Sequence, residues 1–320
     1  MAENEIVVSI LCTAFNHEKY IAQCLDSLLS QKTTFQYEII VHDDASTDHT
    51  ADIIREYEKK ANGKIVAIYQ QENQFSKHIA IVPTILLPMA RGRYLATCEC
   101  DDFWTCDDKL QKQVDFLESH PDYVMCTHAA YYANENGKLD QKSFFTALDH
   151  DSELTMEDIL SRWCFATNSR LIRKEVFPHE KPPYQGKCVN GDFAMAVYLA
   201  LRGRVYYINQ LMCAYRQNSV SSLSVQNKKN KKLAVQRKQE FINMLTRIDD
   251  YTGSVYHTAI EKHKEEFEFS ILVSKGEYKK ALQMKEQVSG LSFVPKCWLI
   301  VRAYFPVADK LVDRLRGILG

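Results

Sequence analysis

The chain has 320 residues, enough for one large domain with an appendage or for two domains. Its formal net charge of −1 argues against a nucleic-acid partner, because no broad basic surface would attract phosphates. Hydrophobic residues make up 46% and charged residues 25%, as in ordinary soluble proteins. No apolar run reaches the roughly 20 residues that a membrane-spanning helix needs.

The ten cysteines are scattered, and none forms a C-x-x-C pair or a zinc-type cluster with histidines. Charged Glu3 and Glu5 precede the first short apolar run, which does not suit a signal peptide. We therefore expect reduced thiols and a cytoplasmic location.

In the first third of the chain, apolar runs alternate with amphipathic segments. Strands are predicted at 6–12, 37–41, 65–69 and 94–98. Helices are predicted around Ile21–Leu29, around Ile53–Tyr57 with Thr47 or Asp48 as N-cap, and over Ile79–Ala90. Strands alternating with helices indicate βαβ units, so we predict an α/β fold with a mostly parallel sheet.

The next part of the chain continues with less regular signals. A helix is expected over 107–119 and a strand over 122–126, followed by a polar, irregular segment at 134–162. An ordered core pattern returns at 167–177, and the later elements are a helix at 193–201, a strand at 205–208 and a polar loop at 215–219.

From about Val225 the composition becomes lysine-rich and helical, with breaks at Gly253, Gly276 and Gly290. We therefore predict a first domain over residues 1–224 and a helical C-terminal extension over 225–320. The last stretch, Trp298–Leu319, mixes aromatic and basic residues, as do helices that lie on membrane surfaces. Packing of this tail onto its own domain, or onto a partner subunit in a homodimer, explains the composition equally well.

Two acidic pairs follow predicted strands directly, Asp43-Asp44 and Asp101-Asp102. Ligands of α/β sheets bind at the carboxyl ends of the strands. Carboxylate oxygens suit Mg²⁺ or Mn²⁺, especially a cation that also holds a phosphate. A solvated turn or a helix N-terminus would explain either pair alone. Because no glycine-rich phosphate loop occurs, a nucleotide would be held by carboxylates and a metal.

Three blocks, Ser9–Asn16, Val41–Asp48 and Glu99–Asp102, resemble family 2 glycosyltransferases in order and separation. Leu110–Leu117 continues the likeness to members that build bacterial surface polysaccharides. The resemblance covers about residues 6–224. It implies the GT-A fold, with a Rossmann-like, mostly parallel sheet flanked by helices. It also implies an inverting, metal-dependent transfer from a nucleotide-sugar to a glycan or lipid-linked saccharide.

The resemblance assigns the donor nucleotide to the first two blocks. Thr13, Phe15 and Asp44 match positions that hold the uracil of a UDP-sugar. A carboxylate can accept the uracil N3–H, and an aromatic ring can stack on the base. A core aromatic is the alternative interpretation of Phe15.

The same resemblance assigns the metal and the base. Asp102 matches the carboxylate that binds Mn²⁺ or Mg²⁺, and Asp101 lies near the ribose and the metal. Glu99 takes the leading acidic place, although a side chain pointing back into the sheet fits its position equally well. Asp192 matches the general base at a helix start, for which a helix N-cap is the alternative.

Two positions depart from the family pattern. Cys100 stands where relatives often carry glycine, and Asn218 stands where many carry a histidine that reaches the metal or diphosphate. Since Asn is a neutral oxygen donor, metal affinity could be weaker or completed by water. The chain has neither the transmembrane helices nor the Gln-x-x-Arg-Trp motif usual in processive members, so we expect one sugar per acceptor.

Two other functions remain open from the sequence. A nucleotidyltransferase would place metal carboxylates similarly, but it needs a glycine-rich basic loop that the N-terminal region lacks. A catalytically inactive sugar-nucleotide-binding scaffold is favoured by Asn218 and disfavoured by the intact carboxylates. The donor sugar, the acceptor hydroxyl and the oligomeric state are not specified by the sequence.

Overall fold

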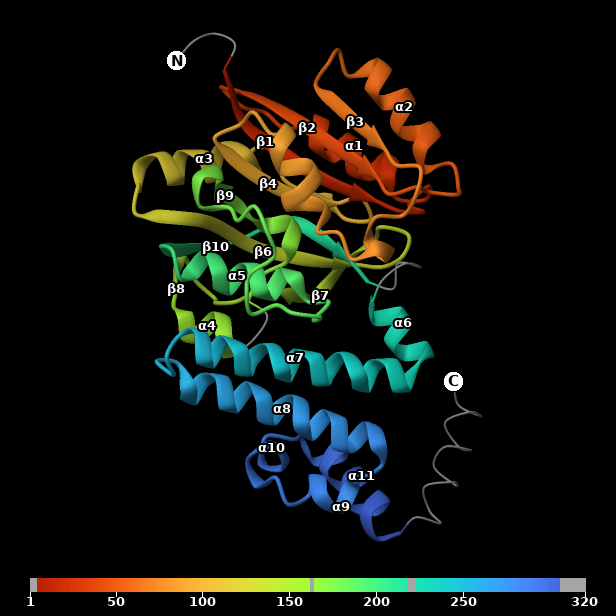
Figure 1. Ribbon diagram of the computed structural model, residues 1–320, viewed down its shortest axis with the longest axis vertical. Coiled ribbons are helices and arrows are strands. Elements are labelled where there is room, and N and C mark those ends of the chain that lie inside the picture. Colours follow the sequence, from red (N-terminus) through yellow and green to blue (C-terminus); the bar gives the residue numbers. More distant parts are fainter. Residues whose placement is uncertain (1–4, 162–163, 218–222, 306–320) are drawn as a thin grey trace. The chain divides into compact units, whose positions relative to one another are not determined.

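The computed structural model describes residues 5–161, 164–217 and 223–305 (Figure 1). Its contacts divide the chain into two compact units. The first, which we call the sheet unit, comprises Met1–Gln185 and Asn190–Gln226. The second, which we call the helical unit, comprises Gly186–Val189 and Asn227–Gly320. The main division thus falls after residue 226, and the short segment Gly186–Val189 belongs to the helical unit by its contacts.

The sheet unit is built on ten strands, eight of which follow the order β3-β2-β1-β4-β9-β6-β10-β5, while β7 pairs with β6 and β8 with β10. The strands are β1 Ile6–Ala14, β2 Gln36–Asp43, β3 Ile65–Tyr69, β4 Tyr94–Glu99, β5 Phe103–Trp104, β6 Tyr123–Ala133, β7 Leu139–Phe145, β8 Ser152–Leu154, β9 Leu171–Arg173 and β10 Arg204–Arg216. The four strands predicted for the first third of the chain are confirmed as β1 to β4.

The sheet is more mixed than predicted. The strands β3, β2, β1 and β4 are parallel neighbours, and β6 is parallel to β10. The three-residue strand β9 lies between these two groups and is antiparallel to both β4 and β6. The α/β class is confirmed, but β5, β7, β8 and β9 are antiparallel additions to the parallel frame.

Five α-helices of the sheet unit have described bounds. They are α1 Ile21–Leu29, α2 Thr50–Lys60, α3 Lys109–Ser119, α4 Met156–Ser161 and α5 Gly191–Ala200. The predicted apolar stripe of α1 is confirmed, because Ile21, Cys24 and Leu28 are buried. The N-cap of α2 is His49 rather than Thr47 or Asp48, although Asp48 Oδ1 accepts the amide hydrogen of Thr50 at 2.9 Å.

The helix predicted over Ile79–Ala90 is wrong. The segment forms a π-helical turn at Val82–Leu86 followed by a 3₁₀ turn at Leu87–Met89. Pro83 and Pro88 explain the difference, because each lacks the N–H that a regular α-helix requires.

Two further segments are more ordered than predicted. Residues 134–162 contain β7, β8 and α4. The sequence of β7 carries no recognisable strand pattern, because its residues 140–143 are all polar and exposed. The strand predicted at 205–208 extends to Arg216, past a register shift against β6 between Ile208 and Leu211. The supposed polar loop at 215–219 therefore begins inside β10.

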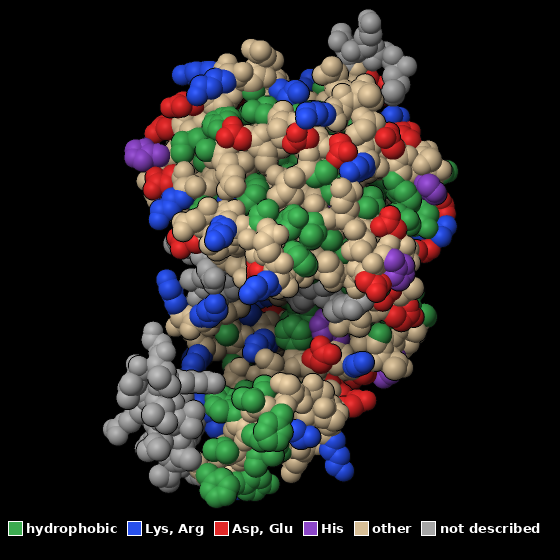
Figure 2. Space-filling view, turned by 180° about the vertical axis from the view of Figure 1, so that it is seen from behind, with side chains coloured by type: hydrophobic (Ala, Val, Ile, Leu, Met, Phe, Trp, Pro, Cys, Tyr) green, Lys and Arg blue, Asp and Glu red, His purple; other side chains and the backbone are tan. Residues whose placement is uncertain are grey.

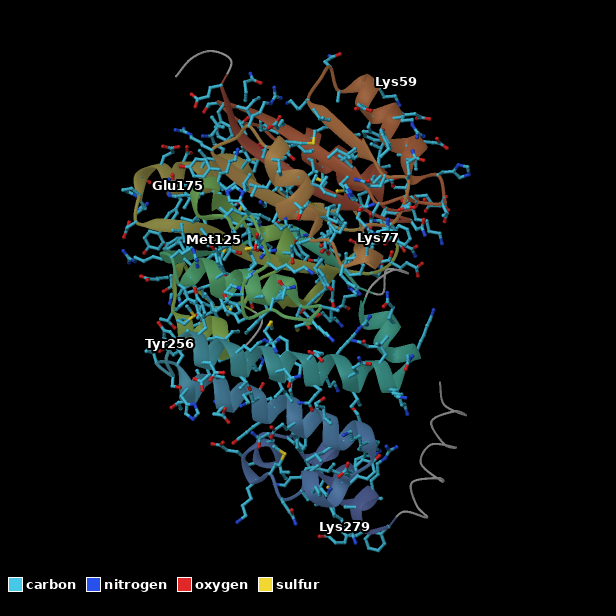
Figure 3. All side chains as sticks on the ribbon, in the orientation of Figure 1. Lys59, Lys77, Met125, Glu175, Tyr256 and Lys279 are labelled. Atoms are coloured by element: carbon cyan, nitrogen blue, oxygen red, sulfur yellow. The ribbon has the colours of Figure 1, made fainter. Side chains whose placement is uncertain are left out.

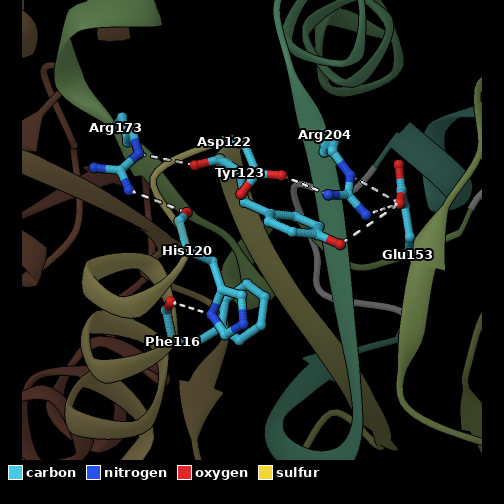
Figure 4. A network of polar contacts seen from close by, with 7 residues as sticks. All are labelled: Phe116, His120, Asp122, Tyr123, Glu153, Arg173 and Arg204. Carbon is cyan, nitrogen blue, oxygen red and sulfur yellow. Dashed lines mark hydrogen bonds and ion pairs between the residues drawn. The ribbon is translucent and has the colours of Figure 1, made fainter.

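Side chains from both faces of the sheet fill the interior of the sheet unit (Figure 3), where Met125 on β6 is fully buried. At the amino-terminal ends of β6 and β10, Arg204 forms ion pairs with Asp122 and Glu153 (Figure 4). Nearby, Arg173 donates to the main-chain oxygen of Tyr123 at 2.8 Å. This network fastens the strand ends opposite to those that carry the acidic pairs, so we assign it a structural role.

The helical unit contains two long helices that pack against each other, and shorter helices follow them in the chain. Its helices are α7 Lys231–Tyr251, α8 His257–Lys275, α9 Tyr278–Ala281, α10 Lys285–Ser289 and α11 Phe293–Tyr304, and α6 Leu223–Lys229 spans the division between the units. The rings of Phe241 and Phe267 stack between α7 and α8 with centroids 4.4 Å apart. The predicted breaks at Gly253, Gly276 and Gly290 are confirmed, and Gly276 caps α8 with a φ of 76°. Within the described ranges, no helix is both long and apolar enough to span a membrane.

Candidate active site

The carboxyl ends of three parallel strands meet at one edge of the sheet. In the strand register, Thr13 on β1 lies beside His42 on β2 and beside Glu99 on β4. The turns that follow are hydrogen-bonded to β1, since Asp44 N donates to Ala14 O and Cys100 N donates to Thr13 O, both at 2.9 Å. The structure therefore brings Thr13, Asp44 and the acidic Glu99–Asp102 loop together at this edge, as the predicted parallel sheet implies.

Asp44 is buried and supports the next loop. Its Oδ1 accepts the amide hydrogen of Gln74 at 2.6 Å, and its Oδ2 accepts that of Phe75 at 3.1 Å. A carboxylate has about four lone-pair positions, so these contacts leave acceptor capacity for a ligand N–H. The adjacent Ala45 has a φ of 61°, a left-handed conformation that is costly for any residue other than glycine.

Two exposed aromatic rings belong to this edge. Phe15 follows β1 and is 37% exposed, which rules out the interpretation of Phe15 as a core aromatic. Phe75, whose amide contacts Asp44, is 60% exposed. Nothing in the sequence indicated a role for Phe75, which begins the 3₁₀ turn Phe75–Lys77 and is held at this edge by the hydrogen bonds that Asp44 accepts.

The acidic loop after β4 is held by Arg216, the last residue of β10. The Arg216 main-chain N–H donates to Asp102 Oδ1 at 2.8 Å, and its Nε donates to Asp101 O at 2.6 Å. The same guanidinium donates to Glu135 O at 2.9 Å and to Gln23 Oε1 at 2.7 Å. Sequence reasoning missed this role, because it placed Arg216 in a polar loop, whereas the residue is buried.

The acidic loop concentrates negative charge. Asp102 is 2% exposed, and its Oδ2 is a buried oxygen with no hydrogen-bond partner in the described structure. Burial, with the nearby charges of Asp101 and Glu99, holds the pKa of Asp102 well above its usual range. Solvent reaches Glu99, but the surrounding protein desolvates its carboxyl and, with the charges of Asp101 and Asp192, raises its pKa to about 7. Glu99 therefore does not turn back into the sheet.

This charge distribution fits a divalent cation. The buried Asp102 Oδ2 has no hydrogen-bond partner in the described structure, and the neighbouring carboxylates repel one another. A divalent cation that prefers oxygen ligands would stabilise both if it bound among them. Asp101 is partly exposed, so the group is not sealed from solvent.

Asp192 lies in the first turn of α5, and the N-cap of that helix is Asn190. The interpretation of Asp192 as an N-cap is therefore wrong. A carboxylate in a first turn is stabilised by the positive end of the helix dipole. Asp192 acts electrostatically on Glu99 and on Tyr215, so the structure brings the predicted base within range of the acidic loop. Asn218, the other noted departure, lies outside the described residues.

A separate group of metal-ligating residue types occurs in the helical unit. One ligand atom each of Asp249, His257 and Glu261 lies within 4.8 Å of the others. His257 Nδ1 and Asp249 Oδ2 are 2.8 Å apart, and Lys264 pairs with Glu261 at 2.6 Å. Since these ion pairs already satisfy part of the group, we assign it a structural role at the α7–α8 turn.

The family of this chain follows from comparisons with known proteins. The family model described as "Glycosyl transferase family 2" matches residues 9–179. The chain belongs to this family. The matched range includes the two blocks assigned to the donor, Ser9–Asn16 and Val41–Asp48, and the acidic loop after β4, and it ends before Asp192.

Curated relatives extend the similarity. An uncharacterized protein of Mycobacterium tuberculosis (strain H37Rv) is 34% identical over 215 residues, which are 66% of this chain and 59% of that protein. The matched part thus spans little more than half of the mycobacterial relative. A putative teichuronic acid biosynthesis glycosyltransferase of Bacillus subtilis is 30% identical over 219 residues, covering 68% of this chain and 82% of that protein.

Solved structures place the fold. The crystal structure of residues 1–349 of Staphylococcus aureus TarS in complex with UDP has a TM-score of 0.52 and 16% identity. The alignment covers 93% of this chain and 79% of that one. The fold of this family 2 member is therefore the GT-A fold with C-terminal helices.

Proposed function

We propose that this family 2 member transfers single sugars from a nucleotide-sugar donor, a UDP-sugar, to a hydroxyl of a glycan or lipid-linked saccharide in bacterial polysaccharide biosynthesis. The gathering of Asp44, the Glu99–Asp102 loop and Asp192 around one edge of the sheet supports this function. The names of the Bacillus subtilis relative and of the UDP-bound TarS structure point in the same direction.

The donor nucleotide would bind at the ends of β1 and β2. Asp44 would accept the uracil N3–H, and Thr13 would complete the contacts to the base. The exposed ring of Phe15 offers a stacking surface at the same edge. Asp101 would lie near the ribose.

Asp101 and Asp102 would hold Mn²⁺ or Mg²⁺, which fits the buried, unpartnered Asp102 Oδ2. When bound, the cation stabilises the negative charge of the departing nucleoside diphosphate. The main-chain N–H of Arg216 fixes the Asp102 carboxylate by binding its other oxygen.

Asp192 would act as the general base. An alcohol is too weakly acidic to ionise near neutral pH, so its proton must move to a positioned acceptor as the oxygen attacks. The α5 amino terminus favours the ionised carboxylate that accepts this proton. Attack on the face opposite the leaving group inverts the configuration of the transferred sugar.

The competing function is a catalytically inactive scaffold that binds sugar nucleotides. Its support is the departure at Asn218. The position of Asp192 in the first turn of α5, electrostatically close to Glu99, favours catalysis instead.

We also propose that the protein is cytoplasmic and contacts the inner face of the membrane through its helical unit. Figure 2 shows apolar side chains at the surface of this unit, where Phe293, Val294 and Tyr304 of α11 are exposed. Lys296 on the same helix is exposed, and its positive charge suits anionic lipids. Co-sedimentation with anionic liposomes tests this, because Phe293→Ser with Val294→Ser should reduce pelleting. Equal pelleting of both proteins rejects membrane contact, and light scattering then tests a homodimer.

Isothermal titration with a panel of UDP-sugars, with and without Mn²⁺, tests the main proposal. One UDP-sugar should bind more tightly with Mn²⁺, and Asp102→Ala should abolish the metal effect. Asp192→Asn should bind the donor normally but stop transfer. Binding without any turnover by the wild type would favour the scaffold, whereas no binding of any nucleotide-sugar would reject both functions.

A further inference from the structure

Three aromatic side chains gather near the carboxyl ends of β6, β7 and β10. Tyr215 of β10 lies beside Tyr132 of β6 in the parallel register, and Phe145 of β7 lies opposite Ala130, two residues before Tyr132. Because side chains alternate between the faces of a sheet, the three rings lie on one face. Their centroids are 6.0 to 6.4 Å apart, with Tyr132 and Phe145 stacked and Tyr215 edge-on to both. We call these three residues the ring cluster.

The ring cluster has surface and hydrogen-bonding groups to offer a ligand. Each of its three side chains is partly exposed. The hydroxyl groups of Tyr132 and Tyr215 have no hydrogen-bond partner among the described residues. A tyrosine combines an apolar ring with a hydroxyl that can both donate and accept. The cluster therefore suits a ligand that is apolar on one face and polar at its edge.

The ring cluster adjoins the proposed metal site and base. Tyr215 directly precedes Arg216, whose main-chain N–H binds Asp102 Oδ1 at 2.8 Å. Burial raises the pKa of Tyr215, and so do the charges of four carboxylates, those of Asp102, Glu99, Asp101 and Asp192. The carboxylates of the candidate active site therefore lie within electrostatic range of this one side chain.

The strand order separates the ring cluster from the proposed nucleotide site. The strands β1 and β2, which would hold the uracil, lie on one side of β4, whereas β6 and β10 lie on its other side, beyond β9. The acidic loop follows β4, so it lies between the two. Arg170 also interacts electrostatically with Asp192 and Glu99, but at 4% exposed it offers a ligand little surface. The partly exposed rings are thus suited to the second substrate, the acceptor.

We propose that the ring cluster binds the acceptor saccharide, packing against the C–H face of one pyranose ring while the tyrosine hydroxyls bond to the hydroxyls at its rim. A pyranose chair carries C–H groups on its faces and hydroxyl groups around its edge, which matches apolar rings that bear phenol hydroxyls. Binding there would bring an acceptor hydroxyl toward Asp192. The inference rests on the proposed transferase function and names the surface that binds its acceptor.

Saturation-transfer NMR on the full chain tests this binding without requiring turnover. The ligands are the methyl glycosides of glucose, galactose, N-acetylglucosamine and N-acetylgalactosamine, each added to the protein with UDP and Mn²⁺. At least one glycoside should receive saturation, most strongly at the C–H protons of one ring face. Tyr132→Leu and Phe145→Leu keep an apolar side chain but remove the flat ring, so they should raise the Kd of that glycoside about fivefold or more.

Two further variants separate ring stacking from a general loss of structure. Tyr132→Phe keeps the ring and should retain most of the glycoside affinity. Phe144→Leu is the matched control, because Phe144 precedes Phe145 on β7 but its ring packs against Tyr131 on the other face, and its Kd should stay at the wild-type value. In transfer assays, Tyr132→Leu should raise the KM of the acceptor, while kcat and the Kd of UDP stay near their wild-type values.

The outcomes separate this assignment from the proposed function. Absence of saturation transfer to every glycoside, in a protein that binds UDP, overturns the assignment and leaves the transferase function standing. Equal glycoside affinities of wild type, Tyr132→Leu and Phe145→Leu overturn it as well. Variants that bind UDP and glycosides normally but bind the UDP-sugar more weakly would place the donor sugar on these rings instead of the acceptor. Failure of the wild type to bind any UDP-sugar overturns the proposed function itself.

Discussion

The main-chain N–H of Arg216 binds Asp102 Oδ1 at 2.8 Å, joining residues that are 114 positions apart in the chain. The Arg216 side chain then binds the loop at Asp101 O and reaches Gln23 on α1. The end of β10 thus determines the position of the acidic loop, and the proposed metal site depends on a residue that is not itself a metal ligand.

Arg216→Gln should therefore weaken both stability and metal binding. The main-chain contact to Asp102 remains, but several charge-assisted hydrogen bonds of the side chain are lost, at a cost of about 1–3 kcal/mol. We expect a lower free energy of unfolding in urea and a weaker effect of Mn²⁺ on UDP affinity. Arg55→Gln, which removes a surface ion pair with Asp52, should change either measurement little. Unchanged Mn²⁺ dependence in Arg216→Gln would show that β10 does not position the site.

Phe15→Ala should weaken the binding of UDP. Loss of one base-stacking ring costs about 1–3 kcal/mol, which weakens the affinity roughly 5- to 150-fold. Phe144→Ala is a close control, because Phe144 is 38% exposed, nearly the same as Phe15, and lies on β7. Titration calorimetry with UDP should separate the two variants, and equal affinities would remove Phe15 from the donor site.

The sequence allowed the parallel frame to be predicted because β1, β2 and β4 are largely buried on both faces and therefore contain near-continuous apolar runs. It also indicated the two acidic pairs, whose position depends only on where those strands end. The β7 strand could not be predicted, because its exposed polar residues carry no burial pattern.

Contacts between distant segments were equally invisible in the sequence. Nothing in the sequence distinguishes Arg216 and Arg170 from other polar residues. Only the pairing of β10 and of the short β9 brings them to the acidic residues. The segment around Val82–Leu86 differs for another reason, because its apolar residues recur at helical spacing while its prolines exclude a regular α-helix.

Ala45→Gly should stabilise the sheet unit. Ala45 has a φ of 61°, and glycine adopts this conformation without the steric cost of a Cβ atom. Part of the gain is offset by the larger entropy of glycine in the unfolded chain, so we expect a net gain of up to about 1 kcal/mol. Ala51→Gly in α2 should have the opposite sign, because helical glycine is unfavourable. Urea unfolding measures both, and destabilisation by Ala45→Gly would contradict the strain argument.

The ion pair between His257 and Asp249 should make the α7–α8 turn more stable in mildly acidic solution. Hydrogen bonding to Asp249, and its charge, raise the pKa of His257 above the ordinary histidine value. Because the folded pKa is the higher one, the pair stabilises the fold fully below the unfolded pKa of about 6.5, and this contribution is lost as the pH rises through the folded pKa. The Tm difference between wild type and His257→Gln should be larger at about pH 5.5 than at about pH 8.5. His179→Gln, at an exposed histidine of the sheet unit, should show no such difference, and a pH-independent effect of His257→Gln would reject the ion pair as its cause.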